Sequence, residues 1–171
     1  EIVFDNNGTL DKFMGDGLMA MWGAPVTGES DSRDAVLAAL QMQAEVDRIN
    51  DVRANEGKKP IEIGIGIDTG QIVAGYLGST KTMSYTVVGP AVNRAARLCG
   101  VAAPGEVLIS DETVGAIKFD DFKLEPMEPV ELKGIREPFG RTNVRGVLNP
   151  STDRMFGARS RVFTGVGEDD G

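Results

Sequence analysis

The sequence predicts a mixed α/β fold built as one domain, and three observations lead to that prediction. Residues 31–52 carry apolar side chains at steps of three and four, which is the period of a helix with one buried face. Residues 61–67 alternate isoleucine with polar residues or glycine, which is the period of a strand. The chain has 171 residues, 41% hydrophobic and 26% charged, an ordinary globular composition with enough length for one core.

The N-terminal part predicts a helix end followed by a hairpin. Residues 1–6 have the pattern of a helix, and Asn7-Gly8 is a typical helix stop. The segments 9–14 and 18–22 are predicted strands, because the glycine-flanked turn 15–17 joins two apolar runs. The long helix opens at Ser30-Asp31, and the isoleucine strand follows it.

The middle of the chain predicts a second hairpin and a second long helix. Residues 71–77 and 83–88 are predicted strands with a short polar turn between them. Pro90 opens a helix that runs to about residue 100, since proline is tolerated at the first helical position. The glycines of 64–78 lack the spacing of a phosphate-binding loop and predict close approach of neighbouring backbone instead.

The C-terminal part predicts strands with a short helix between them. Residues 106–110 form a predicted strand, and Asp111 is the expected cap of a helix over 112–116. Two further strands are expected around 130–132 and at 139–144. Residues 148–171 are rich in glycine and small polar residues, so we expect a poorly ordered polar tail.

Composition excludes several classes of function. The formal net charge is −8 and no dense basic cluster is present, so we expect no nucleic-acid partner. The chain has no histidine, which excludes histidine-based catalysis and histidine metal ligands. A single cysteine predicts a reducing, cytoplasmic setting. No apolar run is long enough to span a bilayer, so no membrane contact is expected within this segment, although it can be the cytoplasmic part of a larger membrane or multidomain protein.

Asp16 is the first candidate for chemistry, and by itself it leaves two interpretations open. An aspartate between two glycines suits a hairpin turn, and this purely structural role is the first interpretation. A turn also exposes a carboxylate that loses little side-chain freedom when it binds an ion. Mg²⁺ binds one or two carboxylates together with substrate phosphates.

Three further polar residues are candidates. Asn93 and Arg97 lie four apart on the predicted helix, so their side chains leave the same face. A solvated polar stripe explains such a pair, but an arginine beside an amide also suits a phosphate near a sugar oxygen. Lys133 precedes Gly134 at a predicted strand end, where a lone lysine is normally a solvated charge.

The order of the motifs is far more specific than any one of them. GTLDKFMGDGLMAMWGAP, IGIGIDTGQIVAGYLGS, YTVVGPAVNRAARLCG and ELKGI follow one another with a long helix after the first. This series resembles the class III nucleotide cyclase catalytic domain in its bacterial adenylate cyclase form, over residues 1–144. The resemblance implies an α+β sandwich with a ferredoxin-like βαββαβ core, and a catalytic domain over 1–147.

The resemblance also implies roles for the first motif. In the family, the aspartate that matches Asp16 is one of two carboxylates that hold paired metal ions, Mg²⁺ or Mn²⁺. The lysine that matches Lys12 contacts the purine and favours adenine. Thr86 matches the second base-selecting position, and a Lys/Thr pair is similar to an adenylate-forming subclass, whereas guanylate cyclases typically use Glu and Cys.

The remaining roles concern the phosphates and the assembly. Asn93 and Arg97 match the residues that stabilise the transition state, and Lys133 matches the lysine that binds the triphosphate. The implied reaction converts ATP into 3′,5′-cyclic AMP and pyrophosphate for intracellular signalling, with two metal ions assisting attack of the 3′-hydroxyl on the α-phosphate. The family's domains pack head to tail and share their sites, so a homodimer is expected.

Two departures from the family pattern leave alternatives open. The family's first metal aspartate lies on a strand that, with the first helix, precedes the first motif, and we expect that strand and helix to be missing before Glu1. A cyclase-like regulatory or interaction domain without catalysis is therefore the second hypothesis. Pro90 stands where many bacterial relatives carry aspartate, with little expected effect. A guanylate cyclase is disfavoured by Lys12, and regulation by bicarbonate is an expectation from the threonine subclass alone.

Overall fold

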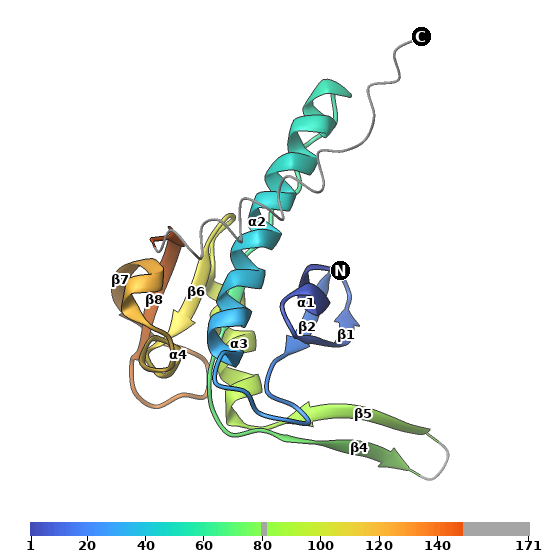
Figure 1. Cartoon of the computed structure of the whole chain (residues 1–171), viewed down its shortest axis with the longest axis vertical. Coiled ribbons are helices and arrows are strands. Elements are labelled where there is room, and N and C mark those ends of the chain that lie inside the picture. The colour runs from blue at the N-terminus through green and yellow to red at the C-terminus, as the bar shows by residue number, and fades with distance from the viewer. Residues whose placement is uncertain (80–81, 149–171) are drawn as a thin grey trace.

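The structure, a computed structural model, describes residues 1–79 and 82–148, so the predicted tail lies outside the described residues apart from Leu148. The helices, including one 3₁₀ helix η1, are α1 (Ile2–Asp5), α2 (Asp31–Asn55), α3 (Pro90–Val101), α4 (Asp111–Ala116) and η1 (Phe119–Asp121). The strands are β1 (Thr9–Met14), β2 (Gly17–Met21), β3 (Ile65–Ile67), β4 (Val73–Ser79), β5 (Thr82–Val88), β6 (Val107–Ser110), β7 (Phe122–Val130) and β8 (Phe139–Val147). The predicted mixed α/β fold is confirmed (Figure 1).

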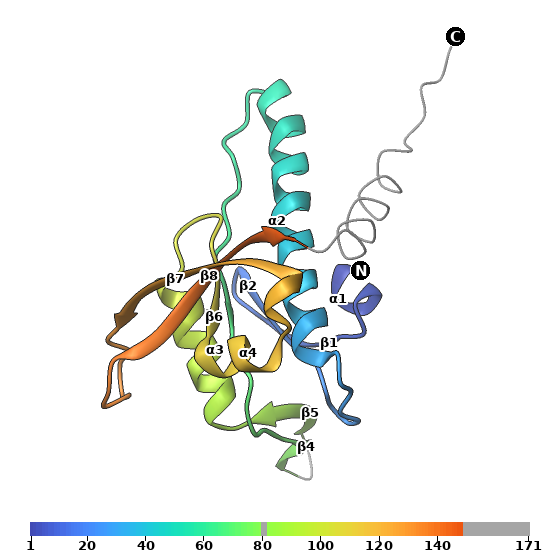
Figure 2. The same cartoon turned by 60° about the vertical axis from the view of Figure 1, so that its left-hand side comes forward.

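A four-stranded sheet in the order β3-β6-β8-β7 forms the centre of the molecule. The pair β3–β6 is parallel and the other two pairs are antiparallel. β1 with β2, and β4 with β5, form two separate antiparallel hairpins. Figures 1 and 2 show the β4–β5 hairpin extending from the body as an arm, and α2 running along the body.

Alternate residues of β6 separate two apolar clusters, one on each face of the sheet. Val107 and Ile109 pack with α2, where Val36 is completely buried. Leu108 faces the other way and packs with Leu98 of α3. Two helices thus cover opposite faces of one sheet, because side chains of a strand alternate between its faces.

The isoleucine segment is shorter as a strand than its alternation predicts. The prediction covered 61–67, but only Ile65–Ile67 pair with a neighbouring strand, through β6. Ahead of this pairing, the Asn50 side chain accepts from the Ile61 amide and donates to the Ile61 carbonyl, both at 2.7 Å. The alternation predicted the strand, but a ladder also needs a partner strand alongside, and only the last three residues have one.

The C-terminal strands and the α4 cap also differ from the prediction. β7 runs over Phe122–Val130, and the predicted strand around 130–132 overlaps only its last residue. Pro126 and Pro129 argue against a strand in the sequence, but β7 is an edge strand, where proline is tolerated. The α4 cap is Ser110, whose hydroxyl accepts from the Thr113 amide, and not Asp111.

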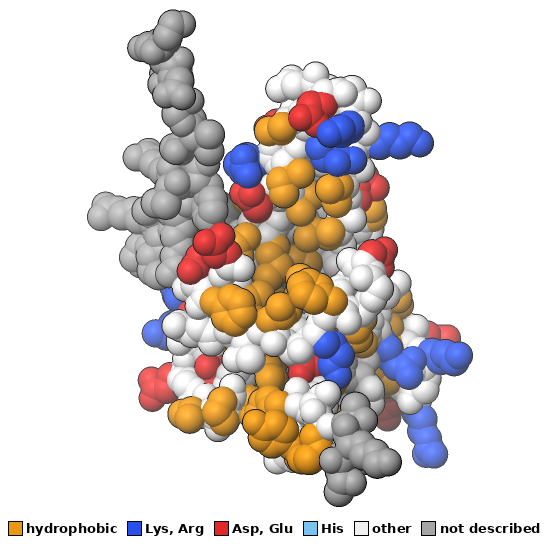
Figure 3. Space-filling view, turned by 90° about the vertical axis from the view of Figure 1, so that its right-hand side faces the viewer, with side chains coloured by type: hydrophobic (Ala, Val, Ile, Leu, Met, Phe, Trp, Pro, Cys, Tyr) orange, Lys and Arg blue, Asp and Glu red, His pale blue; other side chains and the backbone are white. Residues whose placement is uncertain are grey.

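Large apolar side chains are exposed on both hairpins. On β1 and β2 they include Phe13, with 72% of its surface exposed, and on the arm Tyr76, with 70%. Figure 3 faces the side of the molecule on which the N-terminal hairpin lies and shows apolar side chains gathered there. Within the described residues, every helix is too short or too polar to cross a bilayer.

Candidate active site

Two of the predicted site residues, 74 positions apart, meet between the hairpins. Lys12 on β1 donates from Nζ to Oγ1 of Thr86 on β5 at 2.8 Å. Thr86 is 9% exposed, whereas the Lys12 side chain is 45% exposed and reaches solvent beside it. An ammonium and a hydroxyl thus lie side by side, one wholly a donor and the other able to accept.

Asp11 is a third member of this cluster, and the sequence reasoning missed it. Its side chain is fully buried, its Oδ2 accepts from the Thr86 hydroxyl at 3.0 Å, and the same oxygen lies 3.3 Å from Lys12 Nζ. Its other oxygen has no hydrogen-bond partner among the described residues. Its position beside Lys12 is the signal in the sequence, but strand alternation sends neighbouring side chains to opposite faces.

A β-bulge explains why both neighbours reach the same threonine. Leu10 pairs with Ala20 and Lys12 with Met19, so Asp11 is the extra residue on β1. A bulge leaves one residue outside the ladder and re-aims the side chains around it. The break in register therefore brings an acid and a base of adjacent positions to one hydroxyl.

Asn93 and Arg97 lie one turn apart on α3, as predicted, with Asn93 exposed and Arg97 half-buried. Close packing of the backbone sets the position of this helix. A Cβ added at Gly66 of β3 would lie 2.2 Å from the Cys99 nitrogen, and one at Gly64 would lie 2.7 Å from the Ala102 carbonyl oxygen. The predicted close approach at these glycines is confirmed.

Arg97 also approaches the loop that carries Lys133. Gly134 has φ +80°, and a Cβ placed on it would lie 3.5 Å from a terminal guanidinium nitrogen of Arg97. Lys133 is exposed, and it lines a hollow of about 420 Å³ formed by residues 131–138. Two cationic side chains of the predicted site therefore come from neighbouring parts of the fold.

Asp16 lies exposed at the tip of the first hairpin, directly after Gly15, whose φ is +64°. The structure thus confirms the turn. Within residues 1–79 and 82–148, no group of three or more acidic or cysteine side chains is arranged to hold a metal ion. Asp16 therefore presents one exposed carboxylate at the turn.

A buried ion pair lies next to these α3 residues. Arg94 donates to Oδ2 of Asp68 at 2.9 Å from Nε, and its Nη2 lies 2.7 Å from the same oxygen. Burial raises the pKa of the Asp68 carboxyl above its usual value, while hydrogen bonds from Ser110 and Arg94 act in the opposite direction. This pair joins the end of β3 to α3 and so supports the helix that carries Asn93.

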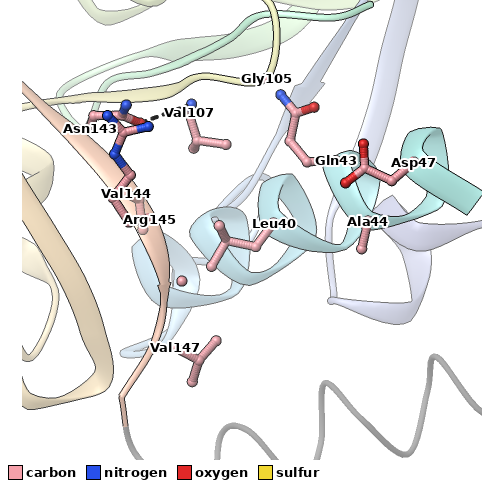
Figure 4. Close-up of a pocket in the computed structure, with 11 residues that line it drawn as sticks. Leu40, Gln43, Ala44, Asp47, Gly105, Val107, Asn143, Val144, Arg145 and Val147 are labelled. Atoms are coloured by element: carbon pink, nitrogen blue, oxygen red, sulfur yellow. Dashed lines mark hydrogen bonds between the residues drawn. The ribbon is translucent and has the colours of Figure 1, made fainter. Parts of the chain in front are cut away.

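Another hollow, of about 330 Å³, lies between α2 and β8 (Figure 4). Leu40, Gln43 and Asp47 line it from α2, and Asn143 and Arg145 from β8. None of the predicted site residues lines it, so it is separate from the candidate active site.

Comparison with known proteins identifies the family. Residues 9–147 match the adenylate and guanylate cyclase catalytic domain, and the chain belongs to this family. Class III cyclases generally use divalent metal ions. The resemblance to class III cyclases is confirmed, and the comparisons include cyclases of both base specificities.

Three relatives illustrate the match. Adenylate cyclase 1 of Rhizobium meliloti is 32% identical over 150 residues, which are 86% of this chain and 22% of that protein. The adenylyl cyclase CyaB from P. aeruginosa is 33% identical with a TM-score of 0.79, covering 84% of this chain and 74% of that chain. The guanylyl cyclase Cya2 is 34% identical with a TM-score of 0.77, covering 87% and 75%. The chain spans about a quarter of the length of the curated relatives it matches.

Proposed function

We propose that this chain contains an adenylate cyclase catalytic domain over residues 1–147, followed by a polar tail over 148–171. The observation that carries the proposal is the contact of Lys12 with Thr86 at 2.8 Å. The adenine edge presents an acceptor at N1 beside a donor at the 6-amino group. Lys12 complements the acceptor and Thr86 the donor, whereas guanine reverses both groups and leaves the ammonium facing an N–H.

The α3 residues and Lys133 supply the phosphate end of the proposed site. Cyclisation forms a bond from the ribose 3′-oxygen to the α-phosphorus and breaks the bond from that phosphorus to the bridging oxygen. Pyrophosphate leaves and the hydroxyl proton is released. Arg97 stabilises charge that develops on the α-phosphoryl oxygens, and Asn93 orients the ribose by hydrogen bonding. Lys133, near Arg97 through Gly134, binds the triphosphate.

Asp16 is the proposed carboxylate ligand for Mg²⁺ or Mn²⁺. Divalent ions, when bound, lower the pKa of the attacking hydroxyl and neutralise charge on the leaving group. The exposed turn leaves the Asp16 carboxylate available to a site shared with another chain. We infer two ions in each complete site, with the second carboxylate supplied from outside the described residues.

The proposed partner is a second copy of this chain, packed head to tail. Exposed apolar side chains on both hairpins support this arrangement, because large exposed apolar surfaces mark interaction sites. In this dimer, Asp16 of one copy serves the site that holds Lys12, Thr86, Asn93 and Arg97 of the other, which yields two equivalent sites.

Reversal of the base preference tests the proposal. Lys12→Glu combined with Thr86→Cys exchanges the donor and acceptor groups, so the ratio of kcat/KM for ATP to that for GTP falls by at least tenfold. The assay uses Mg²⁺ and Mn²⁺ in turn, on this chain and on a chain extended at its N-terminus to the length of its solved relatives. An unchanged ratio contradicts the assignment.

The matched control is Lys58→Glu, which reverses a charge of the same kind on an exposed lysine paired with Glu56. Its nucleotide preference stays that of the wild type, because it lies beyond the end of α2. This control separates a local change at the base from a general effect of net charge.

A regulatory cyclase-like domain without turnover is the second candidate, favoured by the incomplete metal-ligand set among the described residues. Nucleotide binding without cyclic product, in both this chain and the extended chain, supports this candidate over the enzyme.

A further inference from the structure

We propose that Asp11 is a specificity-determining positioning residue: it holds the hydroxyl proton of Thr86, so that Thr86 acts only as an acceptor toward the base. The inference rests on the proposed function, since it concerns how Lys12 and Thr86 distinguish adenine. It assigns a task to a buried carboxylate that takes no part in the chemistry itself.

The chemistry of the three groups fixes the direction of each hydrogen bond. A carboxylate has no proton to give, so Thr86 must donate to Asp11 Oδ2, at 3.0 Å. An ammonium has no lone pair, so Thr86 must accept from Lys12 Nζ, at 2.8 Å. The threonine has one proton and two lone pairs. With the proton and one lone pair engaged, one lone pair remains for a ligand.

Burial makes this arrangement persistent. The Asp11 side chain is fully buried, and a buried carboxylate without hydrogen bonds or a counter-charge is strongly destabilised. Thr86 donates to it, and the Lys12 ammonium lies 3.3 Å from it. Rotation of the Thr86 hydroxyl toward a ligand would therefore remove the one hydrogen bond that Asp11 Oδ2 receives from it.

The bulge on β1 indicates that the fold accommodates Asp11 for this contact. In a regular strand, Asp11 and Lys12 would face opposite sides, and one of them would miss Thr86. The register shift between Leu10 and Lys12 interrupts regular pairing at this position. As a result, the side chains of Asp11 and Lys12 both reach Thr86 on β5.

The consequence concerns selectivity. A free threonine hydroxyl rotates, accepting from the 6-amino group of adenine or donating to the 6-oxygen of guanine or hypoxanthine. When the Thr86 hydroxyl donates to Asp11, it cannot also donate to the base. The 6-oxygen of guanine or hypoxanthine then faces a lone pair of the hydroxyl, which is unfavourable. The base-reading edge is set before the nucleotide arrives, which saves the cost of ordering it on binding.

The test compares ATP with inosine triphosphate, which carries a 6-oxygen and lacks the 2-amino group of guanine. Asp11→Asn offers Thr86 either an acceptor or a donor, so the hydroxyl is free to turn toward the base. We expect the preference for ATP over inosine triphosphate to fall about tenfold, mainly through improved binding of inosine triphosphate. The readouts are displacement of a fluorescent ATP analogue and kcat/KM, on this chain and on the extended chain.

A double-mutant cycle with Thr86→Val shows whether Asp11 acts through the threonine. Without the hydroxyl, Asp11→Asn should no longer change the nucleotide preference, so the two effects are not additive. Additive effects overturn the proposal.

Asp34→Asn is the matched control. Asp34 is another largely buried aspartate that accepts from a hydroxyl, that of Ser30 at 3.0 Å, and it lies outside the candidate site. Its substitution leaves the preference unchanged. If Asp11→Asn fails to fold, as judged by thermal unfolding, Asp11→Ser serves in its place, because serine also offers both a donor and an acceptor.

The outcomes separate the two proposals. A wild-type chain that binds both nucleotides equally overturns the proposed adenylate specificity, and the role of Asp11 with it. A wild-type chain that prefers ATP, with the same preference in the Asp11→Asn variant, overturns the role of Asp11 alone.

Discussion

The two sides of the candidate site are held in place in different ways. Asn93 and Arg97 lie on α3, whose backbone packs against β3 at Gly64 and Gly66 and whose Leu98 is completely buried. Lys12 and Thr86 lie on two hairpins that belong to separate sheets, and hydrogen bonds between side chains join them.

Because of this difference, we expect substitutions on the α3 side to affect the stability of the fold and substitutions on the hairpin side to affect nucleotide selectivity. The α3 side depends on close packing, where a small increase in volume is costly because interiors are dense. The hairpin side depends on hydrogen bonds among Asp11, Thr86 and the partly exposed Lys12, where a substitution changes which groups are offered to a ligand. Four predictions follow this division, from the largest expected effect to the smallest.

Gly66→Val should disrupt the packing of α3 against β3. The added Cβ would lie 2.2 Å from the Cys99 nitrogen and 2.6 Å from the Ala95 carbonyl oxygen, which are backbone atoms of α3. The helix must move away from the sheet, with a loss of about 3 kcal/mol or more in the free energy of unfolding. Urea unfolding measures this loss.

Gly100→Ala on the same helix is the control for this prediction. Beyond the neighbouring helix backbone, no described atom lies within 4 Å of a Cβ added there, so the chain should keep or gain stability, by up to about 1 kcal/mol. Equal unfolding free energies for wild type and Gly66→Val would show that α3 does not depend on this close approach.

In the chain extended at its N-terminus, Arg97→Ala should remove activity and leave the fold intact. Loss of one donor to the developing charge lowers kcat by about 10²–10³. Since Arg97 is half-buried and packs beside Gly134, the unfolding free energy should change by less than about 1 kcal/mol. Normal turnover in this variant contradicts the proposed role.

The same variant also tests the shared site. When Arg97→Ala is mixed with Asp16→Asn, the two inactive chains form mixed dimers with one complete site each. Equal mixing should restore about a quarter of wild-type activity, since half the dimers are mixed and each has one of two sites. No recovery, with dimers present, contradicts the head-to-tail arrangement.

Leu18→Ser should weaken formation of the dimer without weakening the fold of the single chain. Leu18 on β2 is 47% exposed, so its loss changes the stability of one chain little, while a dimer that covers it should dissociate about tenfold more readily. Val52→Ser is matched in exposure, at 49%, and lies on α2. Sedimentation velocity over a dilution series compares them, and equal dissociation constants place the interface elsewhere.

The sequence predicted most elements because their signals are local. The alternation of 61–67, the helical period of 31–52 and the turn at Asn7-Gly8 depend on neighbouring residues, and each marks a feature that the structure contains. The missed features depend on distant ones. β7 tolerates its two prolines because it lies at the sheet edge, and the strand 61–67 is short because only its last three residues meet β6.

The sequence by itself determined the family, the candidate residues and their order, because these are properties of motifs and spacing. Tertiary structure decided which of them touch. Lys12 meets Thr86 across 74 positions, and Arg97 lies beside the glycine that follows Lys133. Asp11 emerged only from the fold, since a bulge cancels the alternation that would send it away from Lys12. The physical reason is that strand periodicity describes residues that are close in the sequence. Hydrogen bonds between two hairpins depend on how the hairpins pack, which periodicity alone does not determine.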